Sequence, residues 1–523
     1  MEPLPLPLPD WLTPLPDAET MRGVDRWAIE QRSVPGIELM ERAGAGVVRA
    51  VERLAPGLGR VAVVCGKGNN GGDGLVVARL LREAGRAVTV LCTSPPEDYT
   101  GDAATNMERL PGEAPLRISS SSSSVCLPLE DVELIVDALL GTGFQGEPHG
   151  EVASAIEAIG ASGLPVLSVD VPSGVDASSG VVAGTAVKAQ MTVTFHAAKP
   201  GLHIRPGRTY AGQVECVDIG IPRGAPMEAS VGLIGDDVLA LIPPRDEEST
   251  KFSSGHVVLA GGSRGLGGAP TMSARAAMRA GAGYVTVCVP ASLQPIVAAS
   301  GAVELMTRAM PEADGALVED AVVEALEACQ RGGRLALALG PGLGRTAGAS
   351  AFARELAARA SLPLVLDADG LNAHAGDIVA LRSRQAPTVL TPHAGELGRL
   401  LDLDSAAIEA ERLRHAREAA KLSGAVVLLK GPDTLVAAPD GRVAVSPGAS
   451  PALATAGTGD VLTGTIAALL AKGLDAFAAA AAGVRLCARA AQLAVERHGA
   501  AEGVIASDVI EALARAGVGD GVR

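Results

Sequence analysis

Aromatic residues are scarce in this chain of 523 residues, which contains only 2 Trp, 3 Tyr and 5 Phe. That number is too small for the rows of stacked rings on which single-strand nucleic-acid binders rely. Basic residues are also in the minority, 44 Lys and Arg against 59 Asp and Glu, which leaves a net charge of −15. A chain this acidic is a poor non-specific binder of nucleic acid or of anionic membranes. We therefore expect neither as a partner.

Cysteine is sparse and unpaired. The seven cysteines are an odd number, lie far apart and form no C-x-x-C pair. This excludes a disulfide framework and a cysteine zinc site, and it indicates reduced thiols in a cytoplasmic protein. Lysine is rarer than the charge count suggests, because only seven of the 44 basic residues are Lys. Lys67, Lys199 and Lys430 all lie in glycine-rich surroundings, so we expect them to be more than arbitrary surface charges.

No stretch has the pattern of a signal peptide or of a membrane span. Residues 1–16 lack a basic region followed by an apolar one, and their proline spacing predicts an extended arm. The most apolar stretch, residues 461–495, is interrupted by four charged side chains. It therefore predicts Ala-rich packed helices, which permit assembly into a homo-oligomer, rather than a span. The composition, 48% hydrophobic and 20% charged, is that of a globular protein of two to four domains.

Apolar strands alternate with helix-length segments along the whole chain, which indicates doubly wound parallel sheets. A turn-rich stretch between about 220 and 250 predicts a linker, so we expect an α/β fold with two domains, 10–222 and 230–520. Six consecutive serines, 119–124, predict a flexible surface loop. The predicted strands are 60–65, 87–92, 132–137 and 164–171 in the first domain, and 256–260, 284–289, 335–339, 364–366, 388–390 and 426–429 in the second.

Polar residues gather at three predicted strand ends in the first domain. The glycine-rich stretch 66–74 follows one strand and precedes the helix 75–83, a place where backbone N–H groups can meet an anion. Ligands of open α/β sheets bind at the carboxyl ends of the strands, so we expect Asn70, Asp137, Asp170 and Ser173 to converge. Their oxygens suit a hard cation. Either aspartate, taken alone, would more often be a helix cap, so the prediction depends on the group of three strand-end loops.

Asp170 is the candidate proton carrier of this group. It ends an apolar strand, and partial burial there is expected to raise its pKa toward neutrality. The alternative is that Asp170 only caps the local structure.

The strongest signal in the second domain is Ala456-Gly-Thr-Gly-Asp460, which opens the predicted helix 461–471. Successive N–H groups at a helix N-terminus form a hole for a transferring phosphoryl group. Asp460 could accept the proton of an attacking hydroxyl, as phosphoryl transfer to an alcohol requires. The alternative is an Asp that only complements the helix dipole. The other glycine loops of this domain, around 261–268 and 340–344, are compatible with simple turns.

The first domain resembles the NAD(P)H-hydrate epimerase domain. Six motifs carry the resemblance in order: Asp17-Ala-Glu-Thr-Met-Arg-Gly-Val-Asp25, Pro35-Gly-Ile-Glu-Leu-Met-Glu-Arg-Ala-Gly44, Asn69-Asn-Gly-Gly-Asp73, Asp137-Ala-Leu-Leu-Gly-Thr-Gly143, Val169-Asp-Val-Pro-Ser-Gly-Val-Asp176 and Phe195-His-Ala-Ala-Lys-Pro-Gly201. The resemblance implies potassium held by Asn70, Asp137 and Ser173, and a catalytic Asp170 that faces the damaged ring. It also implies these substrate-binding residues: Asn69, Asn70, Gly71, Gly72, Asp73, Gly141, Thr142, Gly143, Phe144, Gln145, Gly146, Glu147 and Asp170.

The second domain resembles the ADP-dependent NAD(P)H-hydrate dehydratases, which have a ribokinase-like fold. The motifs are Gly261-Gly-Ser-Arg-Gly-Leu-Gly-Gly-Ala269, Gly340-Pro-Gly-Leu-Gly344, Asp367-Ala-Asp-Gly-Leu-Asn372, Thr391-Pro-His-Ala-Gly-Glu396, Leu429-Lys-Gly-Pro-Asp-Thr434 and Gly457-Thr-Gly-Asp-Val-Leu-Thr-Gly464. The implied substrate contacts are Gly342, Thr391, Pro392, His393, Ala394, Gly395, Glu396, Leu397 and the catalytic Asp460. The implied nucleotide contacts are Lys430, Gly431, Pro432, Asp433, Thr434, Ser450, Pro451, Ala452, Leu453, Ala454, Thr455, Ala456, Gly457, Thr458 and Gly459, with magnesium accompanying the ADP. Ala456 and Ala449-Ser-Pro451 stand where this family often has Gly and Gly-Asn-Pro.

Together the two resemblances imply a bifunctional repair enzyme for hydrated NADH and NADPH. Its first domain interconverts the R and S epimers, and its second uses ADP to dehydrate the S epimer to NAD(P)H, AMP and phosphate. Two other functions fit part of the pattern: a small-alcohol kinase in the second domain, and a first domain that only binds. The fused first domain and the intact set of Asn70, Asp137, Asp170 and Ser173 argue against them.

Overall fold

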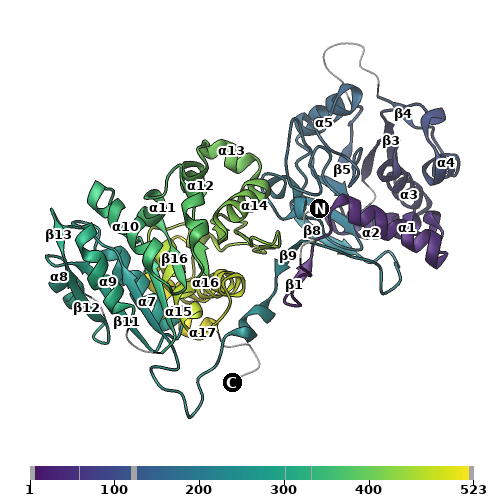
Figure 1. Cartoon of the computed structure of the whole chain (residues 1–523). Helices are drawn as coiled ribbons and strands as arrows, with labels where there is room; N and C mark the ends of the chain where they lie inside the picture. The colour runs from purple at the N-terminus through teal and green to yellow at the C-terminus, as the bar shows by residue number, and fades with distance from the viewer. Residues whose placement is uncertain (1–5, 58, 119–126, 301, 331–332, 518–523) are drawn as a thin grey trace. The chain divides into compact units, whose positions relative to one another are not determined.

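The computed structural model describes residues 6–57, 59–118, 127–300, 302–330 and 333–517 (Figure 1). The chain divides into two compact units. The N-terminal unit is Pro14–Val231, and the C-terminal unit is Gly232–Arg523 together with the segment that ends at Thr13. The serine run 119–124, predicted to be a surface loop, lies outside the described residues.

A seven-stranded sheet forms the centre of the N-terminal unit, in the order β4-β3-β2-β5-β6-β7-β8. Each neighbouring pair is parallel, so the predicted doubly wound α/β class is confirmed for this unit. The strands are β2 (Arg60–Cys65), β3 (Val88–Cys92), β4 (Leu116–Arg117), β5 (Val132–Ala138), β6 (Val166–Val169), β7 (Met191–Phe195) and β8 (Gln213–Val217).

Helices cover both faces of this sheet, which is why its strands are apolar along their whole length. Along β2 the side chains alternate: Val61 and Val63 belong to one buried cluster with Leu75, whereas Ala62 and Val64 belong to another. The helices are α1 (Ala18–Arg32), α2 (Gly36–Leu54), α3 (Asn69–Glu83), α4 (Gly101–Glu108), α5 (Gly150–Ser162) and α6 (Arg208–Ala211), with 3-10 turns η1 (Pro96–Asp98) and η2 (Pro200–Leu202).

The glycine-rich stretch after β2 is shorter than the sequence predicts. Helix α3 begins at Asn69, so the Asn-Asn-Gly-Gly-Asp motif forms its first turn rather than a loop. Gly71 permits this tight start, because a Cβ there would lie 1.7 Å from the Gly66 carbonyl oxygen. The motif therefore presents the unpaired N–H groups of a helix N-terminus at the end of β2.

The C-terminal unit is built on an eleven-stranded sheet, in the order β1-β9-β20-β19-β18-β17-β16-β15-β10-β11-β12. The strands from β18 to β12 in this order pair in parallel, which confirms the predicted class here too, while β18-β19-β20 is antiparallel. The strands are β1 (Leu12–Pro14), β9 (Val231–Ile234), β10 (His256–Ala260), β11 (Tyr284–Pro290), β12 (Met306–Met310), β15 (Leu335–Leu339), β16 (Leu364–Leu366), β17 (Thr388–Leu390), β18 (Val426–Leu429), β19 (Leu435–Ala437) and β20 (Val443–Val445); β13 (Glu312–Ala313) and β14 (Ala316–Leu317) form a separate hairpin.

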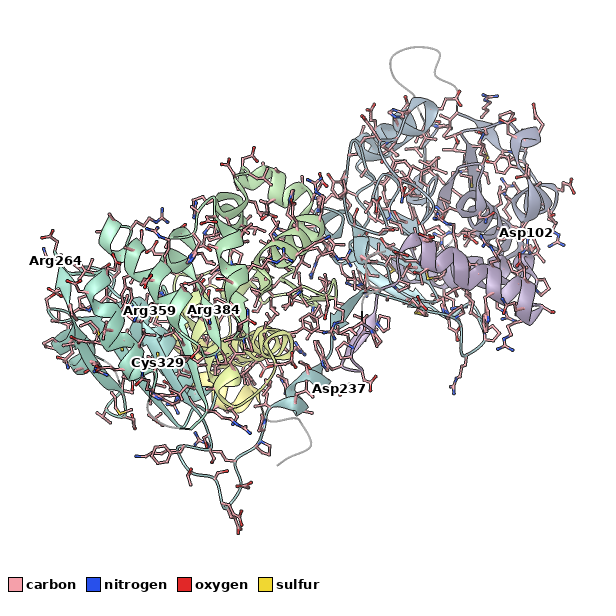
Figure 2. The ribbon with its side chains drawn as sticks, viewed as in Figure 1. Asp102, Asp237, Arg264, Cys329, Arg359 and Arg384 are labelled. Atoms are coloured by element: carbon pink, nitrogen blue, oxygen red, sulfur yellow. The ribbon has the colours of Figure 1, made fainter. Side chains whose placement is uncertain are left out.

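Eleven helices follow among the described residues of this unit: α7 (Gly268–Arg279), α8 (Gln294–Ser300), α9 (Val322–Ala328), α10 (Ala347–Arg359), α11 (Ala368–Asn372), α12 (Ala394–Leu401), α13 (Ser405–Ala410), α14 (Arg412–Ser423), α15 (Thr458–Ala471), α16 (Ala476–His498) and α17 (Ala506–Ala516). The 3-10 turns are η3 (Asp236–Leu241), η4 (Glu319–Ala321), η5 (Ile378–Ser383) and η6 (Pro451–Leu453). Buried arginines tie loops to this framework: Arg384, labelled in Figure 2, donates to the carbonyl oxygens of Ala360 and Leu362 at 2.9 Å each.

The stretch predicted to be a linker carries structure. Within 220–250 the structure has strand β9 and the 3-10 turn η3, and the division between the two units falls in this stretch, between Val231 and Gly232. Strand β1, in the proline-rich arm, lies beside β9 at the edge of the C-terminal sheet. Trp11 anchors it, with its ring centroid 5.5 Å from that of Phe477 on α16. Strand β9 was not predicted because it has only four residues and turn-forming residues flank it.

The Ala-rich segment 461–495 forms two packed helices, as predicted: α15 and α16, which contact each other. Helix α16 is long and apolar enough to cross a membrane by length and composition, but 72% of its most apolar window is buried inside the protein. Small side chains allow the helices of this unit to pack closely. Helix α15, for example, packs on α7 through Gly464.

We predict that Gly464→Ala destabilises the C-terminal unit. A Cβ at Gly464 would lie 1.9 Å from the carbonyl oxygen of Ser273 on α7, so the two helices must separate. Overpacking of this kind costs about 1–3 kcal/mol of unfolding free energy. Denaturant unfolding of the full chain, followed through the fluorescence of Trp11, measures it. Gly268→Ala on α7 is the control, because a Cβ there meets no atom within 4 Å. Equal midpoints for the two variants would contradict the packing argument.

Candidate active sites

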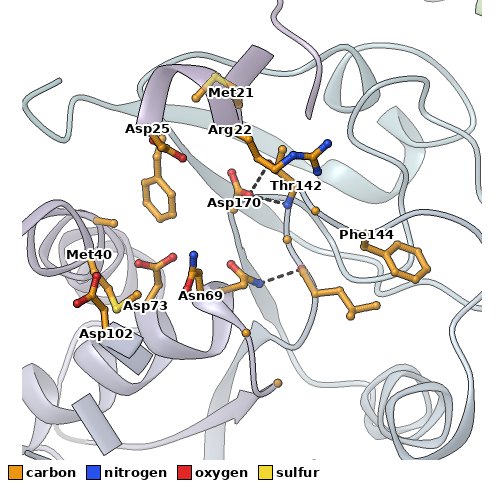
Figure 3. A pocket seen from close by; sticks show the side chains of 18 of the residues that line it. Met21, Arg22, Asp25, Met40, Asn69, Asp73, Asp102, Thr142, Phe144 and Asp170 are labelled. Atoms are coloured by element: carbon orange, nitrogen blue, oxygen red, sulfur yellow. Dashed lines mark hydrogen bonds between the residues drawn. The ribbon is translucent and has the colours of Figure 1, made fainter. Parts of the chain in front are cut away.

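A cavity of about 770 Å³ opens at the carboxyl ends of β2, β5 and β6 in the N-terminal unit (Figure 3). This is the size of a small-molecule site, and its position is the one expected for a doubly wound sheet. Nine of the residues predicted to bind substrate line it: Asn69, Asn70, Asp73, Gly141, Thr142, Gly143, Phe144, Gln145 and Asp170.

Four other predicted substrate residues, Gly71, Gly72, Gly146 and Glu147, are not among the lining residues. Gly71 and Gly72 serve the helix start instead, since a Cβ on Gly72 would lie 2.8 Å from the Met40 side chain. Close packing explains these two glycines without a ligand.

Lys199 and Asp170 form a buried ion pair on one wall of the cavity. The Lys199 Nζ donates to Asp170 Oδ1 at 2.8 Å, to Thr194 Oγ1 at 2.7 Å and to the Phe195 carbonyl at 3.2 Å. Asp170 Oδ2 accepts from the N–H of Thr142 at 2.8 Å and from its hydroxyl at 2.5 Å. Every oxygen of Asp170 therefore has a donor.

The pKa predicted for Asp170 is wrong in direction. Burial does act to raise it and is the largest single effect, but the Lys199 charge and hydrogen bonds from Lys199 and Thr142 together hold the pKa of Asp170 below its ordinary value. The carboxylate is thus ionised at neutral pH. The error arose because Lys199, 29 residues further along the chain, could not be placed beside Asp170 from the sequence.

Two further carboxyl groups point into the same cavity, Asp25 from α1 and Asp73 from α3 (Figure 3). Burial raises the pKa of both, and the nearby Asp170 charge adds to the rise. The pKa of Asp73 lies well above the ordinary aspartate value, with Asp25 also contributing. Three of the four carboxyl groups that line the cavity, those of Asp25, Asp73 and Asp170, thus interact with one buried ammonium group, that of Lys199.

Asn70, which lines the cavity, comes together with Asp137 and Ser173 around the backbone of Leu140. The Asn70 amide donates to the Leu140 carbonyl at 2.9 Å, and Ser173 Oγ accepts from the Leu140 N–H at 2.9 Å. The Ser173 hydroxyl donates to Asp137 Oδ1 at 2.5 Å. Asn70 Oδ1 is buried without a hydrogen-bond partner, and burial raises the pKa of Asp137. An unpaired amide oxygen beside a buried carboxyl and a hydroxyl is a donor set that a hard cation completes.

No role was predicted for the wall formed by α1 and α2, which contributes Met21, Arg22, Asp25 and Met40. These residues lie on amphipathic helices that precede the first strand of the domain, where helix periodicity alone explains them. The scarcity of lysine had marked Lys199 as unusual, and this was the one available signal for it.

In the C-terminal unit, Asp460 lies in the first turn of α15, just after the N-cap Gly457. Gly457 takes φ +91°, and a Cβ there would lie 2.6 Å from the Met272 sulfur, so glycine is required. Burial, and next the charge of Asp367, raise the pKa of Asp460 to about 7, against the opposing charge of Lys430. At neutral pH this carboxyl can therefore either hold or accept a proton.

Asp367, at the end of β16, connects the predicted loops of this site. Its buried carboxylate accepts from Thr391 Oγ1 at 2.8 Å, from Lys430 Nζ at 2.9 Å and from Thr463 Oγ1 at 2.7 Å. The 391–397 loop, the 430–434 loop and helix α15 thus meet at one residue. The sequence analysis quoted Asp367 in a motif but gave it no role.

Lys430 reaches the start of α15. Its Nζ lies 3.6 Å from Glu396 Oε2 and 3.7 Å from where a Cβ on Gly459 would be. The negative charges of Asp367, Glu396 and Asp460 outweigh burial and raise the pKa of Lys430, so the ammonium is charged. A fixed positive charge beside unpaired helix N–H groups suits a phosphoryl group.

His393 and Glu396 form a capping box at the start of α12. His393 Nδ1 accepts from the Gly395 N–H at 3.0 Å, and Glu396 Oε2 accepts from the His393 N–H at 2.9 Å. Burial lowers the pKa of His393, so this ring is neutral at pH 7. Leu397, predicted to contact substrate, is fully buried in the core.

Two predicted nucleotide segments are positioned by internal contacts. Asp433 is fully buried, and its Oδ2 accepts from Arg412 Nε at 3.2 Å, so its side chain supports the 430–434 loop from inside. The Thr458 hydroxyl donates to the carbonyl oxygens of Leu453 at 2.8 Å and Thr455 at 2.9 Å, which fixes the 450–456 segment to α15. Gly342, in the glycine loop 340–344, takes φ +65°, and its carbonyl accepts from Ser263 Oγ at 2.9 Å.

Comparisons with known families match both units. Residues 36–201 match the family model described as "YjeF-related protein N-terminus", and residues 257–515 match that described as "NAD(P)H-hydrate dehydratase".

Whole-chain relatives carry both parts in the same order. A bifunctional NAD(P)H-hydrate repair enzyme of Moorella thermoacetica is 41% identical, over 95% of this chain and 95% of that protein. The enzyme of the same name from Escherichia coli is 34% identical, over 95% of this chain and 93% of its own length. Among solved structures, an ADP/ATP-dependent NAD(P)H-hydrate dehydratase from Bacillus subtilis, co-crystallised with ATP and Mg²⁺, is 30% identical; the match covers 54% of this chain and 96% of that one, with a TM-score of 0.46.

We predict that Lys199→Met destabilises the N-terminal unit by about 3–5 kcal/mol, because it leaves the buried Asp170 carboxylate without its cation. The folded-state pKa of Asp170 is lowered, so the contribution of this group is present above the ordinary aspartate pKa of about 4 and lost as the pH falls. Unfolding of the full chain, followed through Trp27, measures it. Lys188→Met removes an exposed lysine as the control. Adding Asp170→Asn to Lys199→Met should recover part of the loss; a Lys199→Met variant as stable as the control would contradict the analysis.

Proposed function

We propose how this chain, which belongs to the family of bifunctional NAD(P)H-hydrate repair enzymes, divides its two reactions between its two sites. The N-terminal unit interconverts the R and S epimers of hydrated NADH and NADPH. The C-terminal unit dehydrates the S epimer with ADP and releases NAD(P)H, AMP and phosphate. A dehydratase that accepts one epimer would leave half of the damage unrepaired, which gives the fusion a chemical reason.

Epimerisation takes place in the cavity at the ends of β2, β5 and β6. The first turn of α3 presents unpaired N–H groups to the dinucleotide phosphates, and Gly141–Gly143 brings backbone against the ligand. The ion pair of Asp170 with Lys199, braced by Thr142, forms the polar wall that faces the nicotinamide ring. Substrate contacts for Gly71, Gly72, Gly146 and Glu147 have no support from the cavity lining.

Potassium fits the group of Asn70, Asp137 and Ser173. The buried amide oxygen of Asn70 has no hydrogen-bond partner among the described residues. The Asp137 carboxyl is also buried, and the described groups that contact it are uncharged hydrogen-bond donors rather than cations. When bound, the ion would fix the Leu140 carbonyl and the glycine turn that follows it. It would act by holding this loop against the substrate, since Asn70 alone of the three residues lines the cavity.

In the C-terminal unit the hydroxyl of the S epimer is converted into a phosphate leaving group. Asp460, in its ionised form, accepts the hydroxyl proton as that oxygen attacks the terminal phosphorus of ADP. The N–H groups of the first turn of α15 and the Lys430 ammonium receive the charge that develops on the phosphoryl oxygens. Elimination of phosphate then restores the ring double bond. Magnesium, which prefers nucleotide phosphates and water as ligands, would neutralise the ADP charge, and the nearby Glu396 and Asp460 carboxyls are oxygen donors that suit it.

One observation carries this assignment: a carboxyl with a pKa near 7 lies beside a charged lysine at a helix N-terminus opened by Gly-Thr-Gly. A small-alcohol kinase would share that arrangement, but the fused epimerase unit and the whole-chain relatives disfavour it. The deciding experiment supplies purified R or S hydrate of NADH together with ADP and follows the NADH absorbance. Recovery of NADH from S alone by the C-terminal site, and from R only when the N-terminal site is intact, is the expected result.

We predict that Asp460→Asn lowers the rate of NADH regeneration from the S hydrate by about 10²–10⁴-fold, because the general base is lost. The wild-type rate should rise with pH through about 7, as Asp460 becomes ionised, and this rise should be absent from the residual activity of the variant. The variant should still convert R hydrate to the equilibrium mixture of epimers. Near wild-type regeneration of NADH by Asp460→Asn would show that another group accepts the proton.

We also predict that epimerisation depends on potassium. Epimerase rates measured in potassium buffer and in a tetramethylammonium buffer of equal ionic strength should differ strongly, and Asp137→Ala should be slow in both. NADH regeneration from the S hydrate by Asp137→Ala, which depends on the other unit, is the internal control. Identical wild-type epimerase rates in the two buffers would exclude a functional potassium site.

A further inference from the structure

Three carboxyl groups that line the epimerase cavity, those of Asp25, Asp73 and Asp102, have no hydrogen-bond or ion-pair partner among the described residues, and Asp25 and Asp73 are the two that lie near Asp170 and Lys199. Asp25 comes from α1 and Asp73 from α3, and Figure 3 shows both directed into the same space. Within the described chain, no hydrogen bond or ion pair ties either carboxyl to another residue. A half-buried carboxyl that no protein group satisfies is costly unless a ligand or a proton uses it.

Asp170, the sequence candidate for proton transfer, is in the opposite situation. Its two oxygens accept from Lys199, Thr194 and Thr142, as described above. Moving a proton onto it would break the ion pair with Lys199 and release the Thr142 turn. This residue is built to stay ionised and to hold its neighbours in place.

We propose that Asp25 and Asp73 are the proton-transfer pair of epimerisation, sharing one proton, and that Asp170 is a positioning residue. This inference rests on the proposed location of the epimerase reaction in this cavity. It assigns chemistry to Asp25, for which the sequence predicted no role, and it changes the role of Asp73 from a substrate contact to a catalytic residue.

The substrate chemistry requires such a pair. Water adds to the ring enamine so that the hydroxyl lies on the carbon next to the ring nitrogen. The protonated carboxyl gives its proton to that hydroxyl, the C–O bond breaks with its electron pair going to oxygen, and water leaves. The nitrogen lone pair forms a C=N bond. Water then adds to the opposite face, the ionised carboxyl takes the proton released from it, and the electron pair returns to nitrogen. The net result is an inverted carbon and one proton moved between the two carboxyls.

The charges around the cavity support one proton on the pair. Burial and the charge of Asp170 raise the pKa values of Asp25 and Asp73, whereas Lys199 lowers them, and the stronger rise is at Asp73. Asp73 therefore binds a proton more readily than Asp25, so we assign Asp73 as the acid of the pair and Asp25 as the base. The other charged groups that line the cavity are Arg22, Lys67 and Asp102. Because only the singly protonated pair is active, the epimerase rate should be bell-shaped in pH.

The test measures kcat, KM and pH profiles of the full-length enzyme with R hydrate, above the spontaneous rate. Asp25→Asn and Asp73→Asn should each lower kcat by about 10²–10⁴-fold and leave KM within a few-fold. Asp25→Asn should lose the acid limb of the pH profile and Asp73→Asn the alkaline limb. Asp25→Glu, which keeps a carboxyl, should recover part of the rate. If Asp25 and Asp73 served folding alone, neither substitution would remove one limb of the pH profile and leave the other.

Controls separate this inference from the location of the site. Glu30→Gln removes an exposed carboxylate from the same helix α1 and should leave kcat unchanged. Gly143→Trp fills the cavity mouth, where a Cβ meets no atom within 4 Å, and should abolish epimerisation. If Asp25→Asn keeps the wild-type kcat and both limbs of the pH profile while Gly143→Trp is inactive, the proposed proton-transfer pair is wrong but the location of the reaction stands. An active Gly143→Trp would overturn the location of the reaction as well.

Discussion

Each unit of this protein places one lysine ammonium among three carboxyl groups, and the rest of the two sites depends on that imbalance. The groups are Lys199 with Asp25, Asp73 and Asp170, and Lys430 with Asp367, Glu396 and Asp460. One carboxylate in each set, Asp170 or Asp367, takes the direct contact with the ammonium. The remaining carboxyls lie in a buried field of negative charge, so at least one of them keeps a proton near neutral pH. In this way a fixed ion pair prepares a neighbouring acid for proton transfer.

The parallel sheets are what bring these charges together. Asp137, Asp170 and Asp367 all follow directly on, or end, buried parallel strands, and such strands end at one edge of their sheet. The strand interiors are apolar on both faces because helices cover both, so polar groups are admitted only at the ends. The helix starts at α3 and α15 face the same edges and supply unpaired N–H groups for anionic ligands. Acid–base groups and anion sites are therefore neighbours by topology.

The sequence predicted the parts of this arrangement that have local causes. The strands 256–260, 335–339 and 364–366 have the predicted bounds, because a fully buried parallel strand is an unbroken apolar run between turn residues. The antiparallel strands β19 and β20 were not predicted, although they are as long as the predicted strand 364–366, because they lack the helix-length segments that separate the parallel strands. Asp25 was quoted in a motif but given no role, because it lies on a helix of ordinary amphipathic pattern, and the pKa of Asp170 was misjudged because Lys199 reaches it only through the fold. Strands and loop motifs, which depend on neighbouring residues, can be predicted from the sequence. The partner of a charge cannot, because tertiary contacts determine it.

The central claim is that proton affinity in both sites is set by unequal sharing of one ammonium. Carbon-13 NMR of the full-length protein with carboxyl-labelled aspartate, titrated between about pH 4 and pH 9, observes it directly, with resonances assigned through Asp460→Asn, Asp73→Asn and Asp170→Asn. The account predicts that Asp460 titrates near pH 7, that Asp73 titrates well above the ordinary aspartate range, and that Asp170 stays ionised throughout. Ordinary titration of Asp460 and Asp73 near pH 4, together with a protonated Asp170 at neutral pH, would contradict it.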